Sequence, residues 1–111
     1  MKKFLVLYKS NVPATQQMMG ATPEQMKAGM DLWKAWAQQA NKAIVDLGAP
    51  LGNSNEVTGT SVRQSDSKVT GFSILQAESE RSLTALLKQH PHHHAPGASI
   101  EVLEMMATTG M

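Results

Sequence analysis

Apolar side chains fall on both sides of the first segment of the chain, residues 2–9. A β-strand over this range would place Phe4, Val6 and Tyr8 on one side and Leu5 and Leu7 on the other. Because both sides are apolar, we predict a strand that is covered on both faces. The two lysines ahead of it are also typical of a signal peptide, but the apolar run is too short and no small-residue cleavage site follows.

The spacing becomes helical at Thr22. Thr22 can cap a helix, Pro23 suits its first position, and Gln25 completes a capping box. Gly48 is a good left-handed end residue, so we predict one helix over residues 23–47. Trp36 lies on the edge of its apolar stripe, which recurs every three or four residues: Met26, Met30, Trp33, Ala37, Ala40, Ile44 and Leu47.

The remaining segments give two connections, three strands and a second helix. Residues 11–20 are a polar connection in which Met18 and Met19 form either a short helical turn over the core or a mobile lid. Residues 49–55 are predicted to be a loop. Strands are predicted over 57–64, 68–77 and 99–106, with a turn at residues 65–67. Ser79 can cap the second helix, which must end before Pro91.

This order, β-α-β-β-α-β, predicts an α+β fold of the ferredoxin-like type in a single domain over residues 1–111. One antiparallel sheet of four strands would carry two helices on one face. The helices leave the other face bare, although the first strand is apolar on both sides. The simplest cover is a second copy related by two-fold symmetry, so we predict a homodimer with its two sheets packed face to face.

Several stretches together resemble the YCII-related (DGPF-domain) family of small bacterial proteins. They are KKFLVLYKS, TPEQMKAGMDLWKAWAQQ with its W-x-x-W, the loop GAPLG, GFSILQAES, the dipeptide HP, and ASIEVLEMM. The resemblance covers almost the whole chain and implies a dimeric α+β barrel. Related barrel families include monooxygenases, isomerases, dehydrochlorinases and haem enzymes, so the fold does not choose an activity. The Asp-Gly-Pro-Phe turn is replaced here by residues 65–68, Ser-Asp-Ser-Lys, which indicates a divergent branch.

Composition excludes several classes of function. A formal net charge of +1 and only five Phe, Trp and Tyr residues give neither a basic surface nor a stacking platform, which argues against nucleic-acid binding. There is no cysteine, which removes disulfides, thiolate metal sites and Cys nucleophiles and agrees with a cytoplasmic location. No apolar stretch approaches the roughly 20 residues that span a bilayer, so no membrane partner is expected.

All four histidines lie in the stretch HPHHHAPG, residues 90–97. One interpretation is a metal site, for which His90 with His92 or His94 is the best geometric pair. A structural zinc site has four ligands, however, and the only nearby carboxylates are those of Glu101 and Glu104. No physiological metal site is therefore predicted. The pattern favours a purely structural interpretation, in which His90 ends a helix and the other three histidines lie in a solvated loop.

The third interpretation is a catalytic centre. His90 and Tyr8 are then the candidates for proton transfer, because histidine exchanges protons near neutral pH and a buried phenol needs a partner. The predicted pocket between helix and sheet would be lined by Trp33, Trp36, Met30, Ser73, His92 and His94. The same stripe of Trp and Met residues is also typical of a packed core. A cleft filled by Trp33 and Met30 would count against an enzyme.

These features predict a YCII-like protein that binds a small molecule, or an acid–base enzyme of isomerase or lyase type, for a small apolar or aromatic compound. They leave open whether any reaction is catalysed, and they imply no cofactor. One alternative is a non-catalytic dimeric module that is accessory to another protein. A second alternative is a metal-binding protein that uses the histidines at positions 90, 92 and 94.

Overall fold

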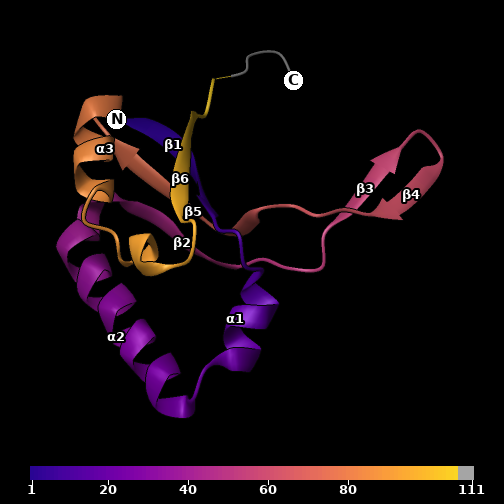
Figure 1. Ribbon diagram of the computed structural model, residues 1–111. Coiled ribbons are helices and arrows are strands. Elements are labelled where there is room, and N and C mark those ends of the chain that lie inside the picture. The colour runs from indigo at the N-terminus through magenta and orange to yellow at the C-terminus, as the bar shows by residue number, and fades with distance from the viewer. Residues whose placement is uncertain (108–111) are drawn as a thin grey trace.

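The computed structural model describes residues 1–107 and contains one main sheet with helices on one side (Figure 1). The main sheet has the order β2-β5-β1-β6 and is antiparallel throughout, with β1 at Lys2–Lys9, β2 at Ile44–Pro50, β5 at Val69–Ala77 and β6 at Ser99–Glu104. The helices are α1 (Ala14–Gly20), α2 (Pro23–Ala40) and α3 (Glu80–Leu87), with short 3₁₀ turns η1 (Asn41–Ala43) and η2 (Pro91–His94). The predicted ferredoxin-like α+β fold is confirmed.

The core lies between the sheet and helices α2 and α3. Strand β1 occupies an inner position, and its side chains alternate as predicted, since Phe4, Val6 and Tyr8 are at most 1% exposed. They pack with Trp36, Ala40, Leu75, Leu83 and Leu87. On the opposite face of the same strand, Leu5 and Leu7 are only half-buried.

The start of α2 follows the sequence prediction, but its end does not. Thr22 and Gln25 form the capping box, with the Thr22 Oγ1 accepting from the Gln25 N–H at 3.1 Å. The helix stops at Ala40 because Asn41 turns to a positive φ of 31°. Residues 44–50 then form β2, so the prediction of one helix over 23–47 is wrong.

Pairing with β5 determines the conformation of residues 44–50. Ile44 pairs with Leu75, and a bulge between Asp46 and Ala49 holds Gly48 at φ 82°. A Cβ on Gly48 would lie 1.7 Å from the Phe72 carbonyl oxygen, so only glycine fits. This glycine therefore shapes a strand and does not end a helix.

The segment predicted as one strand over 57–64 is a hairpin. Strands β3 (Asn55–Thr58) and β4 (Ser61–Gln64) are joined by a two-residue turn in which Gly59 has φ 60°, and they form a sheet of their own. We call residues 55–64 the arm. The residues 65–67 that were predicted as the turn between two strands of the main sheet instead connect the arm to β5.

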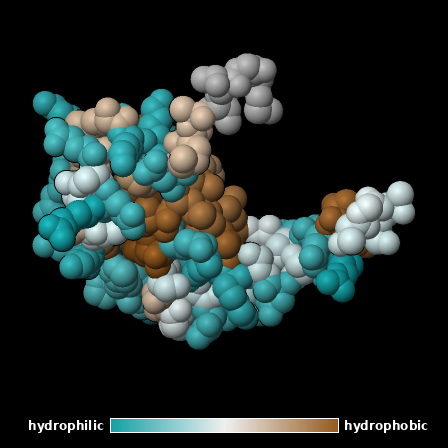
Figure 2. All heavy atoms as spheres, turned by 90° about the horizontal axis from the view of Figure 1, so that it is seen from above, coloured by the Kyte–Doolittle hydropathy of each residue, from teal (hydrophilic) through white to brown (hydrophobic). Residues whose placement is uncertain are grey.

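The bare face of the sheet and the arm lie on the same side of the molecule. Figure 1 shows the arm projecting away from the side on which α2 and α3 lie. Figure 2 shows apolar residues gathered on the part of the body that faces the arm. We call these residues the apolar face; Leu103 is 43% exposed and the others are half-buried: Leu5, Leu7, Phe72, Ile74 and Leu103.

Two further segments complete the comparison with the sequence. Ser79 caps α3 as predicted, with its Oγ accepting from the Ser82 N–H at 3.1 Å. Residues 14–20 are helical, but Met18 and Met19 are 51% and 85% exposed and do not fold over the core. None of the helices in residues 1–107 has the length and apolar character needed to cross a membrane.

Candidate functional site

Three aromatic rings pack against the buried imidazole of His90, and a fourth packs against one of them. The ring lies stacked on Tyr8 with centroids 4.7 Å apart, and edge-on to Trp33 at 4.3 Å. Trp36 is tilted against it, also at 4.3 Å, and the ring of His92 lies 5.3 Å from that of Tyr8. Strand β1, helix α2 and the turn η2 each contribute rings. We call these five residues the aromatic cluster.

The hydrogen bonds of His90 determine which ring nitrogen carries the proton. His90 caps η2, and its Nδ1 accepts from the backbone N–H of His92 at 2.9 Å. In a neutral imidazole the other nitrogen, Nε2, must then carry the hydrogen. His90 is only 2% exposed, and its Nε2 is buried with no hydrogen-bond partner among residues 1–107. The result is a buried N–H donor directed among aromatic rings.

Burial keeps His90 neutral. Burial, together with smaller contributions from charge repulsion by His92 and His93, lowers the pKa of His90 to about 3. His90 is therefore a neutral hydrogen-bond donor near neutral pH and a very weak base. The sequence singled it out for proton exchange, whereas its surroundings suit it to donation without proton transfer.

Tyr8 brings a second polar group to the same place. Its hydroxyl donates to the Ser73 Oγ at 2.9 Å, and Ser73 donates onward to the Leu47 carbonyl oxygen at 2.6 Å. Burial raises the pKa of Tyr8, against a smaller lowering by the Ser73 bond, so the phenol stays protonated. Its oxygen retains the capacity to accept a hydrogen bond. Gly71 pairs opposite Tyr8, and a Cβ there would make an ordinary van der Waals contact with Tyr8 Cδ2 at 3.5 Å.

The other histidines have separate partners. The Nε2 of His92 lies 2.7 Å from the Lys9 carbonyl oxygen, and the Nε2 of His93 lies 2.9 Å from that of Leu87. Burial lowers the pKa of His92, against the backbone hydrogen bonds to Lys9 and Ser99, which raise it. His94 is exposed. Within residues 1–107, no three His, Asp or Glu side chains come together in a way that could hold a metal ion.

The structure thus brings together most of the residues that the sequence proposed for a pocket. Tyr8, Ser73, Trp33, Trp36, His90 and His92 are neighbours through the contacts above. Met30 is 59% exposed and His94 lies in solvent, so neither joins them. His90 does follow the end of α3, where its N–H donates to the Leu87 carbonyl oxygen at 3.1 Å, but its ring is buried. The interpretation of His92 as a solvated loop residue is corrected, since it is 7% exposed.

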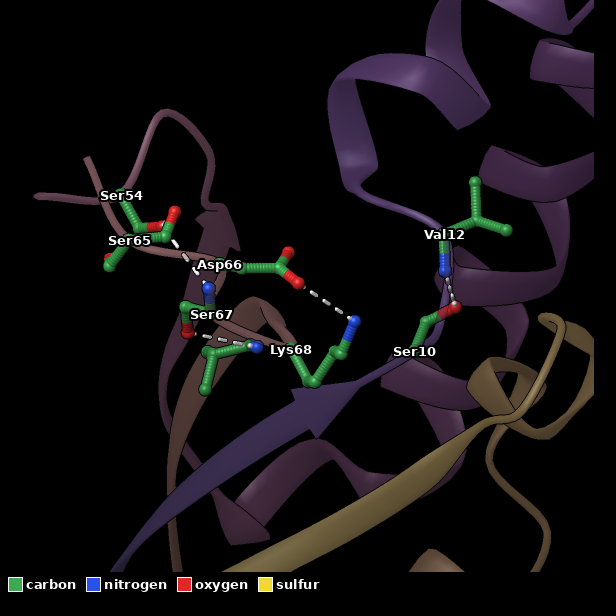
Figure 3. Close-up of polar contacts among 8 residues, drawn as sticks. Ser10, Val12, Ser54, Ser65, Asp66, Ser67 and Lys68 are labelled. Atoms are coloured by element: carbon green, nitrogen blue, oxygen red, sulfur yellow. Dashed lines mark hydrogen bonds and ion pairs between the residues drawn. The ribbon is translucent and has the colours of Figure 1, made fainter.

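A residue that the sequence did not single out holds the histidine segment in place. Ser10, 2% exposed at the end of β1, donates from its Oγ to the Pro96 carbonyl oxygen at 2.7 Å. The same Oγ accepts from the Val12 N–H at 3.2 Å, as Figure 3 shows. The next backbone N–H, that of Asn11, also donates to Pro96. A serine after a strand gives no sequence signal for this role.

Two hollows lie outside the aromatic cluster. One of about 430 Å³ lies between the start of α1 and the base of the arm, and its lining includes Thr15, Asn53 and Asp66. The other, of about 170 Å³, lies between α3 and β6 and includes His93. Neither is lined by a residue of the aromatic cluster, whose rings pack on one another.

Comparisons with known proteins identify a similar fold. Neither a protein-family model nor a curated protein matches the sequence. Among solved structures, the chain is similar to 5-chloro-2-hydroxyhydroquinone dehydrochlorinase (TftG) from Burkholderia phenoliruptrix AC1100, in a complex with 2,5-dihydroxybenzoquinone. The TM-score is 0.51 at 18% sequence identity, and the match covers 97% of this chain and 95% of that chain. The similarity shows a shared α+β barrel fold over nearly the whole of both chains.

Proposed function

We propose that this chain is a YCII-like α+β barrel protein that binds a small, planar, largely apolar molecule at the aromatic cluster. The observation that carries the proposal is the buried Nε2–H of His90, which has no hydrogen-bond partner. In this proposal, an oxygen atom of the ligand accepts that hydrogen. The TftG complex, with its bound quinone, supports the choice of ligand class.

A purely structural role accounts poorly for this imidazole. Leaving a buried donor unpaired costs about 1–3 kcal/mol, and an aromatic or aliphatic side chain would fill the same space without that cost. The edge-on geometry to Trp33 allows an N–H contact with the indole face, but such contacts are weak. Only Nδ1 serves the fold, by capping η2. The unpaired Nε2–H is therefore the group that a ligand would satisfy.

The neutral protonation state of His90 suggests which kind of reaction it could assist. A neutral donor that is already in place and surrounded by apolar rings stabilises negative charge that develops on a carbonyl oxygen, as in an enolate or a phenolate. Tyr8, held by Ser73, supplies a second polar contact within the stacked arrangement. We propose that His90 holds the ligand oxygen by a hydrogen bond without transferring a proton, a role that suits an acid–base enzyme of isomerase or lyase type.

Access requires a ring of the cluster to move. Trp33 is half-buried, whereas Trp36 is 3% exposed. On α2, Trp33 follows Met26 and Met30, which are 42% and 59% exposed. Because these two side chains are exposed to solvent, they constrain the Trp33 ring little. We propose that Trp33 swings outward and that a flat ligand takes its place beside His90.

The test uses 2,5-dihydroxybenzoquinone as the probe and follows the imidazoles by ¹H–¹⁵N NMR, with calorimetry for affinity. We expect the His90 Nε2–H signal to shift on binding, and the His90→Asn variant to bind at least about 10-fold more weakly, since one hydrogen bond is lost. Asparagine can keep an acceptor near the Nδ1 position, but its amide is too short to place a donor at the Nε2 position. His94→Asn, which removes an exposed imidazole from the same segment, is the control. An unchanged His90 signal at millimolar probe would refute the site and leave the accessory module as the better function.

We also propose that the chain forms a homodimer through the apolar face. The solvent-accessible surface is 8012 Å², whereas a compact monomer of 12.0 kDa exposes about 6,000 Å². The excess, about 2,000 Å², is larger than the roughly 800 Å² that one partner buries in a standard interface. Sedimentation should show a dimer for the wild type and a monomer for Leu7→Glu, which places a charge on the apolar face. A monomeric wild type at millimolar concentration would refute the dimer.

A further inference from the structure

The arm carries an apolar pair on one face and a charged pair on the other; we call the face with the apolar pair the valine face. Val57 and Val62 are paired across the hairpin, and they are 67% and 66% exposed. Glu56 and Arg63 are paired on the opposite face, where their side chains form an ion pair at 3.0 Å. Alternation of this kind is typical of a strand pair with one side in solvent and the other packed on protein. Within this chain, the valine face remains in solvent.

A two-stranded hairpin is marginally stable by itself in water. The arm also stretches the molecule, since the radius of gyration is 15.5 Å whereas a compact domain of this length has about 13 Å. An isolated, extended hairpin with an unpaired apolar face is an unfavourable arrangement for a monomer. It becomes favourable when another surface covers the valines.

The chain enters and leaves the arm at anchored positions, because the Ser10 N–H donates to the Lys68 carbonyl oxygen and the Leu51 N–H to that of Thr70, each at 2.9 Å. Further contacts join the two sides of the arm at its base. Ser54 donates from its Oγ to the Ser65 carbonyl oxygen at 2.8 Å, and the Ser67 N–H donates to the same Oγ at 3.2 Å. Lys68 and Asp66 form an ion pair beside them, and Figure 3 shows these contacts together. An arm held at its base loses less conformational freedom when its tip binds than a flexible loop would. The arm is therefore built to reach a partner in a defined place.

We propose that the arm is a dimer clamp, in which the valine face of each arm packs against the other subunit of the homodimer proposed above. The arm projects on the side of the apolar face, so a second copy seated on that face lies within its reach (Figure 1). Two-fold symmetry gives each subunit one arm to extend and one to receive. The excess surface of about 2,000 Å² per chain is that of an extended shape, as expected when parts of the chain are covered by a second copy.

The test compares two double variants that add the same charge to opposite faces of the arm. Val57→Glu with Val62→Glu alters the valine face, and Thr58→Glu with Ser61→Glu alters the other face at the neighbouring cross-strand pair. We expect the valine variant to raise the dimer dissociation constant about 100-fold or more in sedimentation, because four valines per dimer lose their contacts. The control should stay within a few-fold of the wild type.

The outcomes separate the clamp from the dimer itself. Equal dissociation constants for the wild type and the valine variant would overturn the clamp and leave the dimer standing. A monomeric wild type would overturn both. Circular dichroism of each variant shows whether the main sheet is folded.

A second measurement locates the arm directly. The chain contains no cysteine, so Thr58→Cys, on the face opposite the valines, accepts a single spin label. Labelled ¹⁴N protein is mixed with unlabelled ¹⁵N protein, so that only signals of the partner subunit are observed. The clamp predicts strong paramagnetic broadening of a contiguous set of partner residues. Mixed dimers without such broadening would overturn it.

Discussion

Acidification should destabilise the fold through His90. The pKa of His90 is about 3 in the folded protein and near 6.5 in an unfolded chain. Between these values the unfolded chain binds a proton that the folded chain does not, so stability is complete above pH 6.5 and falls as the pH falls toward 3. Burial lowers the pKa of His92 as well, so that residue acts in the same direction.

The expected effect is large compared with the stability of a small domain. Each pH unit in this range costs about 1.4 kcal/mol for one fully linked proton, so the change from pH 6.5 to 5.0 costs about 2 kcal/mol through His90. A domain of this size has a free energy of unfolding of about 5–15 kcal/mol. The loss should therefore be evident well before general acid denaturation.

Urea denaturation at pH 7.0, 6.0 and 5.0, at one fixed protein concentration, measures this dependence. His90→Asn should lower stability at pH 7.0 but show a shallower decline with acidification, because its side chain does not titrate. His94→Asn removes an exposed imidazole from the same segment and should decline as the wild type does. If the free energy of unfolding fell equally steeply with pH in the wild type and in His90→Asn, the reasoning would be refuted. NMR signals of a doubly protonated His90 ring in the folded protein at pH 5.0 would also refute it.

Three further substitutions test single contacts, each by urea denaturation at pH 7. Gly48→Ala should lower the free energy of unfolding by at least about 3 kcal/mol, because its Cβ would lie 1.7 Å from a backbone oxygen. Gly59→Ala has open space around it and should lower it by about 1–2 kcal/mol. Equal losses for the two variants would contradict the close approach at Gly48. Tyr8→Phe should cost about 1 kcal/mol through the lost bond to Ser73, and a neutral result would show that bond to be unimportant. Thr22→Ala should cost about 1 kcal/mol by removing the cap of α2, and no change would contradict the capping box.

Local patterns in the sequence predicted local structure well. The alternation in residues 2–9 and the caps at Thr22 and Ser79 depend on neighbouring residues only, and the structure confirms all three. The end of α2 failed for a tertiary reason. Residues 44–47 continue the helical spacing, but pairing of β2 with β5 provides backbone hydrogen bonds and decides their conformation. A single sequence does not contain that information.

The arm was missed for a similar reason. Residues 57–64 have the Val and Thr content of one strand, and Gly59 in their middle was the only sign of a turn. The inward placement of Tyr8, Trp33 and Trp36 was predicted better, because helical and strand periodicity direct these residues toward the core. The burial of His90 and His92 was not predictable, since it depends on how the segment after Pro91 folds back under the end of β1.

The acid lability caused by His90 and its proposed role in ligand binding both depend on whether the imidazole takes up a second proton. A ligand that offers an uncharged carbonyl oxygen to Nε2–H satisfies the donor and leaves the folded pKa low, so its stabilisation of the protein should be independent of pH. A ligand that offers an anionic oxygen favours the imidazolium form and raises that pKa. Its stabilisation should then increase as the pH falls below 6.5, offsetting the acid lability of the free protein. The pH dependence of ligand-induced stabilisation would therefore report the charge on the bound oxygen. If the same pH dependence were found in His90→Asn, the ligand would have to bind elsewhere.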